Sequence, residues 1–222
     1  MRKQIKQSFA LLAVTLFLAS AAMAIEEPKY SVIEKSEPYE LREYAPQILA
    51  EVQVEGDMDT ASGEGFRLIA AYIFGKNQVQ EKISMTTPVT IESSSESKSQ
   101  KIAMTTPVTI EASNSNNLSS TKSVWRVTFV MPSEYTLSTL PKPLDARVQI
   151  REIPAERKAV VVFSGRYNEE KVGEQIKALQ GWIDTKNLQM IGQPQFARYN
   201  PPWTLPFLRR NEILIQVRNP LK

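Results

Sequence analysis

The chain of 222 residues contains no cysteine and no histidine. Without cysteine it cannot form disulfides, thiolate nucleophiles or Cys-type sites for zinc and iron–sulfur clusters. Without histidine it lacks the commonest general base, the Ser-His-Asp triad and imidazole ligands for metals. Glycine-rich phosphate-binding fingerprints are also absent. No pairing of nucleophile and base is visible, so we predict a protein without enzymatic activity and without a metal site.

The chain has no excess of positive charge once the N-terminus is set aside. The chain has 27 Lys and Arg against 24 Asp and Glu. Arg2, Lys3 and Lys6 lie within the first 24 residues, which contain no acidic residue, so the remainder has 24 of each sign. Because nucleic-acid binding depends on a basic surface, we predict no nucleic-acid partner.

The N-terminus has the three parts of a secretory signal peptide. A basic start precedes the short apolar run 9–22, and Ala22-Met23-Ala24 fits the small-x-small cleavage rule. We predict a signal peptide over 1–24 and a periplasmic or secreted mature chain over 25–222. The alternative is an uncleaved anchor, but polar residues interrupt the run, and a membrane span needs about 20 mostly apolar residues. No cysteine follows, so we expect no lipoprotein anchor.

Two segments have the apolar spacing of amphipathic helices. The segment 60–75 places five apolar residues on one face: Phe66, Ile69, Ala70, Ile73 and Phe74. Polar residues at 57–60 can cap its start, and Gly75 stands where a C-terminal cap belongs. The segment 168–186 opens with Asn168 and carries a second apolar stripe: Val172, Ile176, Leu179, Trp182 and Ile183.

Alternating segments predict strands before and after each helix. They cover 39–44, 48–54, 124–131, 147–153, 158–164, 189–199 and 211–218. The glutamates of the two early strands alternate too, and we expect them to face outward: Glu40, Glu43, Glu51 and Glu55. The order strands, helix, strands occurs twice. It predicts one α+β domain of two quasi-copies, with a curved antiparallel sheet and two flanking helices.

A near-exact internal repeat lies between the two helices. Residues 82–92 return at 101–111 with ten of eleven positions identical. We predict two neighbouring strands joined by a Ser-rich turn, with Met85 and Met104 directed into apolar surroundings. Iron ligation by these two methionines is the less favoured alternative.

Three blocks resemble the SOUL haem-binding family. They are the paired motifs at 82–89 and 101–108, the region from Val130 to Pro154, and the run 197–212. The blocks stand in family order and cover nearly all of the mature chain, which resembles an exported bacterial member. The resemblance implies a distorted antiparallel β-barrel of two pseudo-repeats, with two four-stranded sheets flanked by two long helices. It also implies a monomer.

The resemblance implies a ligand as well. Members are described as binding haem or other tetrapyrroles, usually reversibly, and we expect haem as a cofactor that folding does not require. Since histidine and cysteine are absent, we predict binding by apolar contact, with modest affinity and no His axial ligand. The candidate surface is the exposed side of the first helix together with a late loop: Phe66, Arg67, Ala70, Tyr72, Ile73, Lys76, Trp203 and Arg209.

Other interpretations remain open at this stage. Effector-type folds related to this family include hydrolases, and Glu64 could act as a base if it lay in a deep cleft. A ligand-free interaction module of the cell envelope is a further alternative. Tyr72 and Tyr199 could ligate iron or bridge core and water. In the run 209–212, the arginines could bind carboxylates, but an Arg–Glu pair within the fold is favoured.

Overall fold

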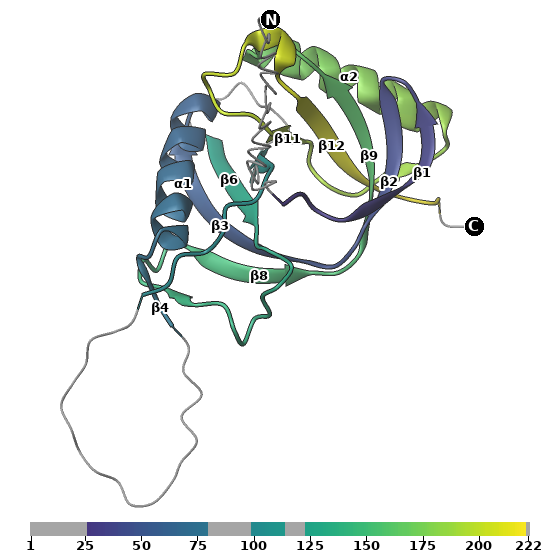
Figure 1. The fold of residues 1–222 in the computed structure, drawn as a ribbon. Coiled ribbons are helices and arrows are strands. Elements are labelled where there is room, and N and C mark those ends of the chain that lie inside the picture. Colours follow the sequence, from purple (N-terminus) through teal and green to yellow (C-terminus); the bar gives the residue numbers. More distant parts are fainter. Residues whose placement is uncertain (1–25, 80–98, 114–122, 221–222) are drawn as a thin grey trace, which may run out of the picture.

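The computed structural model describes residues 26–79, 99–113 and 123–220 (Figure 1). The predicted signal peptide and the first copy of the internal repeat, with Met85, lie outside these residues. The elements in chain order are β1 (Tyr30–Ser36), β2 (Tyr39–Tyr44), β3 (Gln47–Gly56), α1 (Met58–Ile73), β4 (Asn77–Gln78), β5 (Val108–Ala112), β6 (Ser123–Val130), β7 (Lys142–Pro143), β8 (Gln149–Ile153), β9 (Glu156–Phe163), α2 (Glu169–Thr185), β10 (Gln189–Met190), β11 (Gln195–Arg198), the short 3₁₀ helix η1 (Pro206–Leu208) and β12 (Asn211–Arg218).

One large antiparallel sheet dominates the fold. Its strand order is β1-β2-β9-β12-β11-β5-β6-β3-β8, with β10 on β12, and β4 and β7 form a separate pair. The sheet curves strongly, and α1 and α2 cover its outer face (Figure 1). The predicted α+β class with an antiparallel sheet and two helices is confirmed. Within the described residues no pairing joins β1 to β8, so a closed barrel stays a prediction.

The element order repeats along the chain. β2-β3-α1-β5-β6 is followed by β8-β9-α2-β11-β12, and the sheet order is symmetric about the junction between β11 and β5. Apart from β1 and β10, four strands lie on each side of this junction, within one continuous sheet rather than in two separate ones. The first strand of each copy pairs with a strand of the other copy: β2 pairs with β9, and β8 pairs with β3. The two copies are therefore interlocked.

Both helices begin and end close to the predicted residues. Asp57 caps α1 by accepting a hydrogen bond from the Thr60 amide at 2.8 Å, so the helix starts two residues earlier than predicted. Gly75 follows its C-terminus with a φ of +117°, a conformation that favours glycine. α2 matches the prediction within one residue at each end, and Asn168 caps it.

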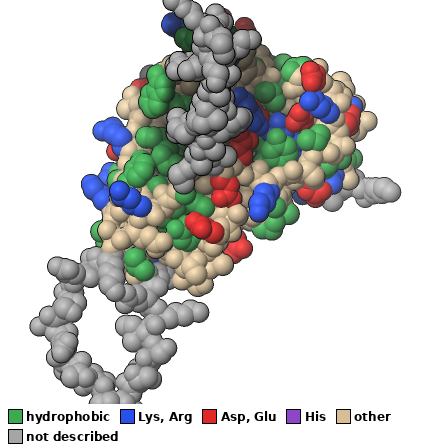
Figure 2. All heavy atoms as spheres, in the orientation of Figure 1, with side chains coloured by type: hydrophobic (Ala, Val, Ile, Leu, Met, Phe, Trp, Pro, Cys, Tyr) green, Lys and Arg blue, Asp and Glu red, His purple; other side chains and the backbone are tan. Residues whose placement is uncertain are grey.

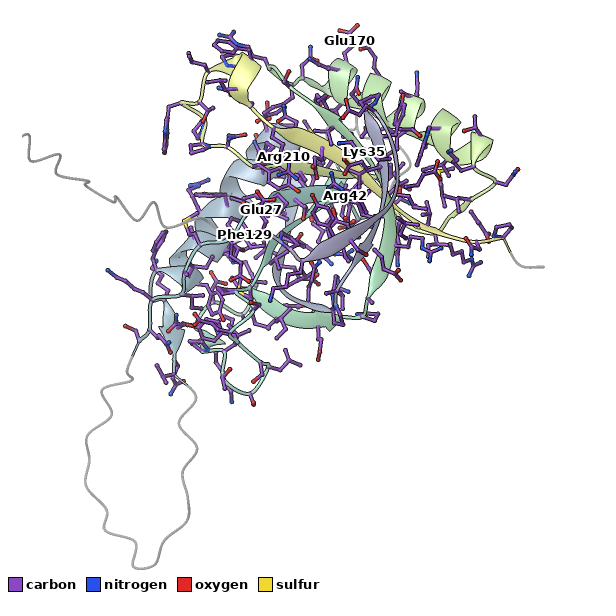
Figure 3. All side chains as sticks on the ribbon, turned by 45° about the vertical axis from the view of Figure 1, so that its right-hand side comes forward. Glu27, Lys35, Arg42, Phe129, Glu170 and Arg210 are labelled. Carbon is purple, nitrogen blue, oxygen red and sulfur yellow. The ribbon has the colours of Figure 1, made fainter. Side chains whose placement is uncertain are left out.

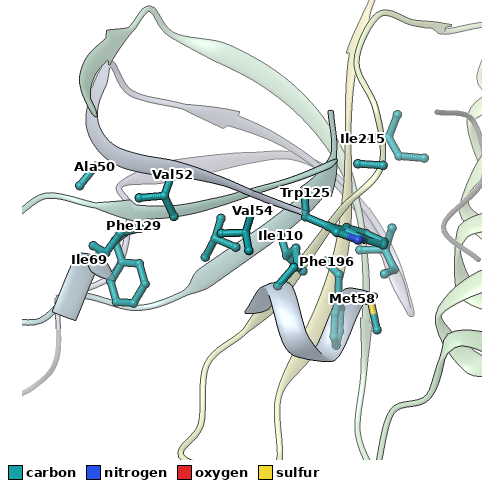
Figure 4. Packing of buried hydrophobic residues seen from close by; sticks show 14 of the residues in the cluster. Ala50, Val52, Val54, Met58, Ile69, Ile110, Trp125, Phe129, Phe196 and Ile215 are labelled. Atoms are coloured by element: carbon teal, nitrogen blue, oxygen red, sulfur yellow. The ribbon is translucent and has the colours of Figure 1, made fainter. Parts of the chain in front are cut away.

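α1 lies unusually close to β6 at one glycine. A Cβ atom on Gly65 would sit 2.6 Å from the side chain of Val127, well inside van der Waals contact. The helix therefore packs directly on the strand, and the core forms between them (Figure 4). Its fully buried members include Ile69, Trp125 and Phe129. None of the described helices is long and apolar enough to cross a membrane.

Candidate functional site

The exposed side of α1 is the first part of the candidate surface. Phe66 is 39% exposed, and its ring lies 5.6 Å from that of the buried Phe129. Arg67 is exposed beside it and donates from Nε to the Gly63 carbonyl at 3.3 Å. Phe66 thus presents an aromatic face to solvent with a cation next to it, an arrangement suited to a flat apolar ligand that carries a carboxylate.

Three residues predicted on this exposed side are buried instead. Ala70, Tyr72 and Ile73 have exposed fractions of 8%, 1% and 0%, so their placement on the surface was wrong. The segment around Ile102 covers this end of α1, and its amide donates to the Ile73 carbonyl at 2.8 Å.

Tyr72 is also unavailable to iron. Its hydroxyl donates to the Pro141 carbonyl at 2.9 Å, and burial raises its pKa above the usual value.

Two residues at the C-terminal end of α1 are exposed. Phe74 was predicted in the buried stripe, but it is the C-cap residue and is 55% exposed, so that prediction was wrong. Lys76 is exposed but follows the C-terminal end of α1, at the opposite end from the late loop.

The second part of the candidate surface is the loop between β11 and β12. Trp203 is 83% exposed, as predicted for a surface residue. Arg209 is half-buried and donates to the carbonyls of Thr204 and Pro202, at 2.8 Å for the first, so it braces the loop. The sequence did not single out three further exposed apolar residues of this loop, because it does not show which apolar side chains remain uncovered: Leu205, Phe207 and Leu208.

The loop and α1 meet at the N-terminal part of the helix. Arg198, the last residue of β11, donates to the hydroxyls of Ser62 on α1 and of Tyr167. The loop starts just after this contact and lies beside the upper end of α1 in Figures 1 and 3. The structure therefore places the start of the loop that carries Trp203 beside the N-terminal part of α1, the helix that carries Phe66 and Arg67.

The concave face of the sheet contains a buried charge network. Glu212 is fully buried and accepts from both terminal guanidinium nitrogens of Arg42 at 2.9 and 3.1 Å. It also accepts from Arg210 at 2.8 Å and from the Tyr199 hydroxyl at 2.7 Å. Arg210 in turn pairs with Glu27 at 3.0 Å, and Figure 3 shows this group at the centre of the sheet. The favoured Arg–Glu pairing is confirmed.

The network fixes the charges of its members. Burial is the largest single influence on the pKa of Arg42 and lowers it, but the hydrogen bonds and charge interactions with Glu212 and Tyr44 together outweigh burial and raise the pKa. Burial raises the pKa of Tyr199, and the adjacent Glu212 charge adds to the effect. Tyr199 is thus held as a neutral donor to Glu212, and Glu212 has no free oxygen with which to act as a base.

Further ion pairs line the rest of the concave face. They are Arg151 with Glu51 at 2.9 Å, Arg126 with Glu111 at 2.5 Å and Lys158 with Glu156 at 3.2 Å. A cavity of about 70 Å³ is lined by Arg151, Glu156 and Lys158 among others, and a second of about 250 Å³ opens beside residues 26–29. Drug-sized ligands occupy pockets of about 300–1,000 Å³. Neither cavity is large enough to enclose a tetrapyrrole.

The remaining candidates have structural surroundings. Glu64 is 41% exposed and lies 3.6 Å from Arg147, and it lines neither cavity, so the deep cleft required of a hydrolase base is not found around it. Met104 is half-buried against the core, as predicted. Within the described residues, no group of three acidic side chains could hold a metal ion. Basic and acidic side chains are interspersed on the face seen in Figure 2.

Solved structures share this fold at low sequence identity. The C-terminal domain of EcmrR superposes with a TM-score of 0.57 and 12% identity, covering 86% of this chain and 99% of that one. A hydrolase encoded by lin2189 from Listeria innocua superposes with a TM-score of 0.51 and 10% identity, covering 81% and 91%. These similarities show the fold alone.

Comparison with protein sequences identifies the family of this chain, which the similarity of folds does not. Human Heme-binding protein 2 is 30% identical over 212 residues, which cover 91% of this chain and 92% of the relative. The mouse protein of the same name is 28% identical over 211 residues, which cover 90% and 91%. The family model described as SOUL heme-binding protein matches residues 25–100 and 91–216. This chain therefore belongs to the SOUL haem-binding protein family.

Proposed function

We propose that this protein binds haem or a related planar tetrapyrrole reversibly and without catalysis, as a monomer in the cell envelope. The observation that carries the proposal is its membership of the SOUL family, with similarity to Heme-binding protein 2 along nearly the whole chain. No nucleophile–base pair accompanies this similarity, and Glu212 is saturated by its partners.

The structure supports an external site for this ligand. The two cavities described above are small, whereas Phe66 on α1 and Trp203 on the adjoining loop expose aromatic rings to solvent. Stacking of the macrocycle on these rings would supply most of the affinity, because aromatic side chains contribute large contact areas. Arg67 would hold one propionate.

Iron ligation is not part of the proposal. The chain has no His or Cys, and the hydroxyls of Tyr72 and Tyr199 are committed to Pro141 and Glu212. Met58 and Met131 are buried in the core, Met104 is half-buried against it, and Met190, which is 39% exposed, lies on β10 outside the proposed surface. Affinity should therefore depend on the macrocycle and not on the metal.

Haemin and iron-free protoporphyrin are expected to bind the purified mature chain with equal affinity. Phe66→Ala should weaken both about tenfold, since an exposed aromatic contact is worth about 1–2 kcal/mol, and Arg67→Glu should weaken both through repulsion of the propionates. Leu144→Ala, at an exposed apolar residue elsewhere, is the matched control. Absorbance and fluorescence titrations measure these affinities.

Two results of these titrations would contradict the proposal. A preference for haemin that is lost on replacing a Met or Tyr would show iron ligation. Absence of saturable binding to either compound would leave the ligand-free or hydrolase alternatives.

The envelope location is supported by the leader alone. A basic start, an apolar run and Ala22-Met23-Ala24 predict cleavage before Ile25. N-terminal sequencing of the protein recovered from its native host is expected to begin at Ile25. Recovery of chains that retain Met1 in the membrane fraction would show an uncleaved anchor instead.

A further inference from the structure

The loop between β11 and β12 exposes an apolar cluster. In residues 201–208, here called the apolar loop, four large side chains are mostly in solvent: Trp203 at 83%, Leu205 at 56%, Phe207 at 69% and Leu208 at 62%. Single exposed apolar residues are common on protein surfaces, but a contiguous cluster of this kind marks an interaction site. The haem surface proposed above uses Trp203 and leaves the other three unexplained.

The apolar loop is held rigidly in this exposed form. Prolines occupy positions 201, 202 and 206 and fix the backbone there. The Arg209 side chain binds two carbonyls of the loop, and the Gly165 amide donates to the Pro206 carbonyl at 2.9 Å. Exposure is thus built into the fold, and little conformational entropy would be lost when the loop meets a partner.

Most backbone carbonyls of the apolar loop accept hydrogen bonds from within the protein. The Thr204 amide donates to Pro201 at 3.0 Å, and the Leu208 amide donates to Leu205 at 2.9 Å. Together with the Arg209 and Gly165 contacts, these bonds cover the carbonyls of residues 201, 202, 204, 205 and 206. Because these carbonyls are already paired, burying them costs less than burying carbonyls that would lose bonds to water.

We propose that the apolar loop inserts into the interface of a lipid bilayer. Trp is favoured at the boundary between headgroups and acyl chains, and Leu and Phe are favoured just below it. A stable protein–protein contact needs about 800 Å² on each partner, more than four side chains of one short loop provide. Arg166 adjoins the loop at Gly165, is exposed and makes no ion pair among the described residues, so it can meet a lipid phosphate.

Trp203 provides a direct test. The mature chain 25–222 is mixed with vesicles of phosphatidylcholine, and with vesicles that contain one part phosphatidylglycerol in five. Trp125 is fully buried, and Trp182 is half-buried and stacked on Tyr39, so Trp203 should dominate any spectral change. We expect a blue shift of the emission and co-sedimentation with both kinds of vesicle, retained at high salt because the contact is apolar.

The double variant Leu205→Ser, Phe207→Ser keeps the fluorophore and is expected to weaken vesicle binding tenfold or more. Leu144→Ser, at a residue 60% exposed elsewhere, is expected to bind like the native chain. Circular dichroism verifies that both variants are folded.

Three outcomes would overturn the proposal. They are unchanged binding of the double variant, binding only to anionic vesicles that salt abolishes, and a dimer in sedimentation that the double variant loses. The last would assign the loop to a second copy of this chain. Haemin titration of the double variant separates the two proposals, because Leu205 and Phe207 lie outside the haem surface and their replacement should leave haemin affinity unchanged.

Discussion

Replacing Glu212 by Gln is expected to lower the free energy of unfolding by about 3 kcal/mol. The Glu212 side chain is fully buried, and it is the shared acceptor of Arg42 and Arg210. A neutral amide of the same shape leaves Arg42, which is 2% exposed, with only Glu40 as a charged partner, at 2.7 Å. Urea denaturation should show a lower midpoint with an unchanged slope.

A second substitution tests the cause of this loss. Adding Arg42→Met to Glu212→Gln removes the stranded charge, so the double variant should regain part of the stability. Asp145→Asn breaks an exposed ion pair with Arg147 and is expected to leave the midpoint close to that of the native chain. If Glu212→Gln and Asp145→Asn had similar midpoints, the buried network would not contribute as described.

Replacing Gly65 by Ala is expected to destabilise the protein by about 1–3 kcal/mol, although Ala is the better helix former by about 1 kcal/mol. The added methyl group would lie 2.6 Å from the Cβ and Cγ2 atoms of Val127. The Cβ cannot rotate away, since it is fixed to the β6 backbone. Either α1 must move from the sheet or the core must open, and thermal unfolding should show a transition several degrees lower.

Gly63 is the matched control, two residues earlier in the same helix. An added Cβ there meets nothing within 4 Å, so Gly63→Ala should stabilise by about 0.5–1 kcal/mol. Val127→Ala should cost less in the Gly65→Ala background than in the native chain, because it removes the two Cγ contacts of the clash and leaves only the Cβ contact. A higher transition temperature for both glycine variants would contradict the close approach of α1 to β6.

The helices could be predicted from the sequence because their signals are local. Asn168 and Gly75 act on the residues next to them, and the caps formed as expected. The start of α1 was less certain, since several residues between 57 and 60 can serve as a cap and the sequence alone does not choose among them.

Exposure along α1 could not be predicted in the same way. Phe66 and Ile73 are seven residues apart and face nearly the same direction, yet their exposed fractions are 39% and 0%. The periodicity of the sequence predicts the direction in which a helical side chain points. Whether that side chain is buried depends on segments that are distant in the sequence and pack over it. Ile102 covers the end of the helix that holds Ile73.

The charge network lay beyond sequence reasoning for a related reason. Alternation in the early strands suggested that Glu40 and Glu51 face solvent, but Glu51 is 9% exposed and Glu40 is half-buried. In a strongly curved sheet the second face is enclosed as well, so its charged residues need partners. Arg42 and Glu212 stand 170 positions apart, and no local pattern connects them.

The pairing of β2 and β8 with strands of the other copy also constrains how the chain can fold during its synthesis. One edge of β3 stays unpaired until β8 has been synthesised, since Gln47 pairs with Ile153. One edge of β2 likewise stays unpaired until β9 has been synthesised. A nascent chain that ends after β6 therefore leaves open sheet edges, which readily pair with other chains. Productive folding then requires the whole second copy to emerge, and until that moment the first copy must be kept apart from other unfolded chains.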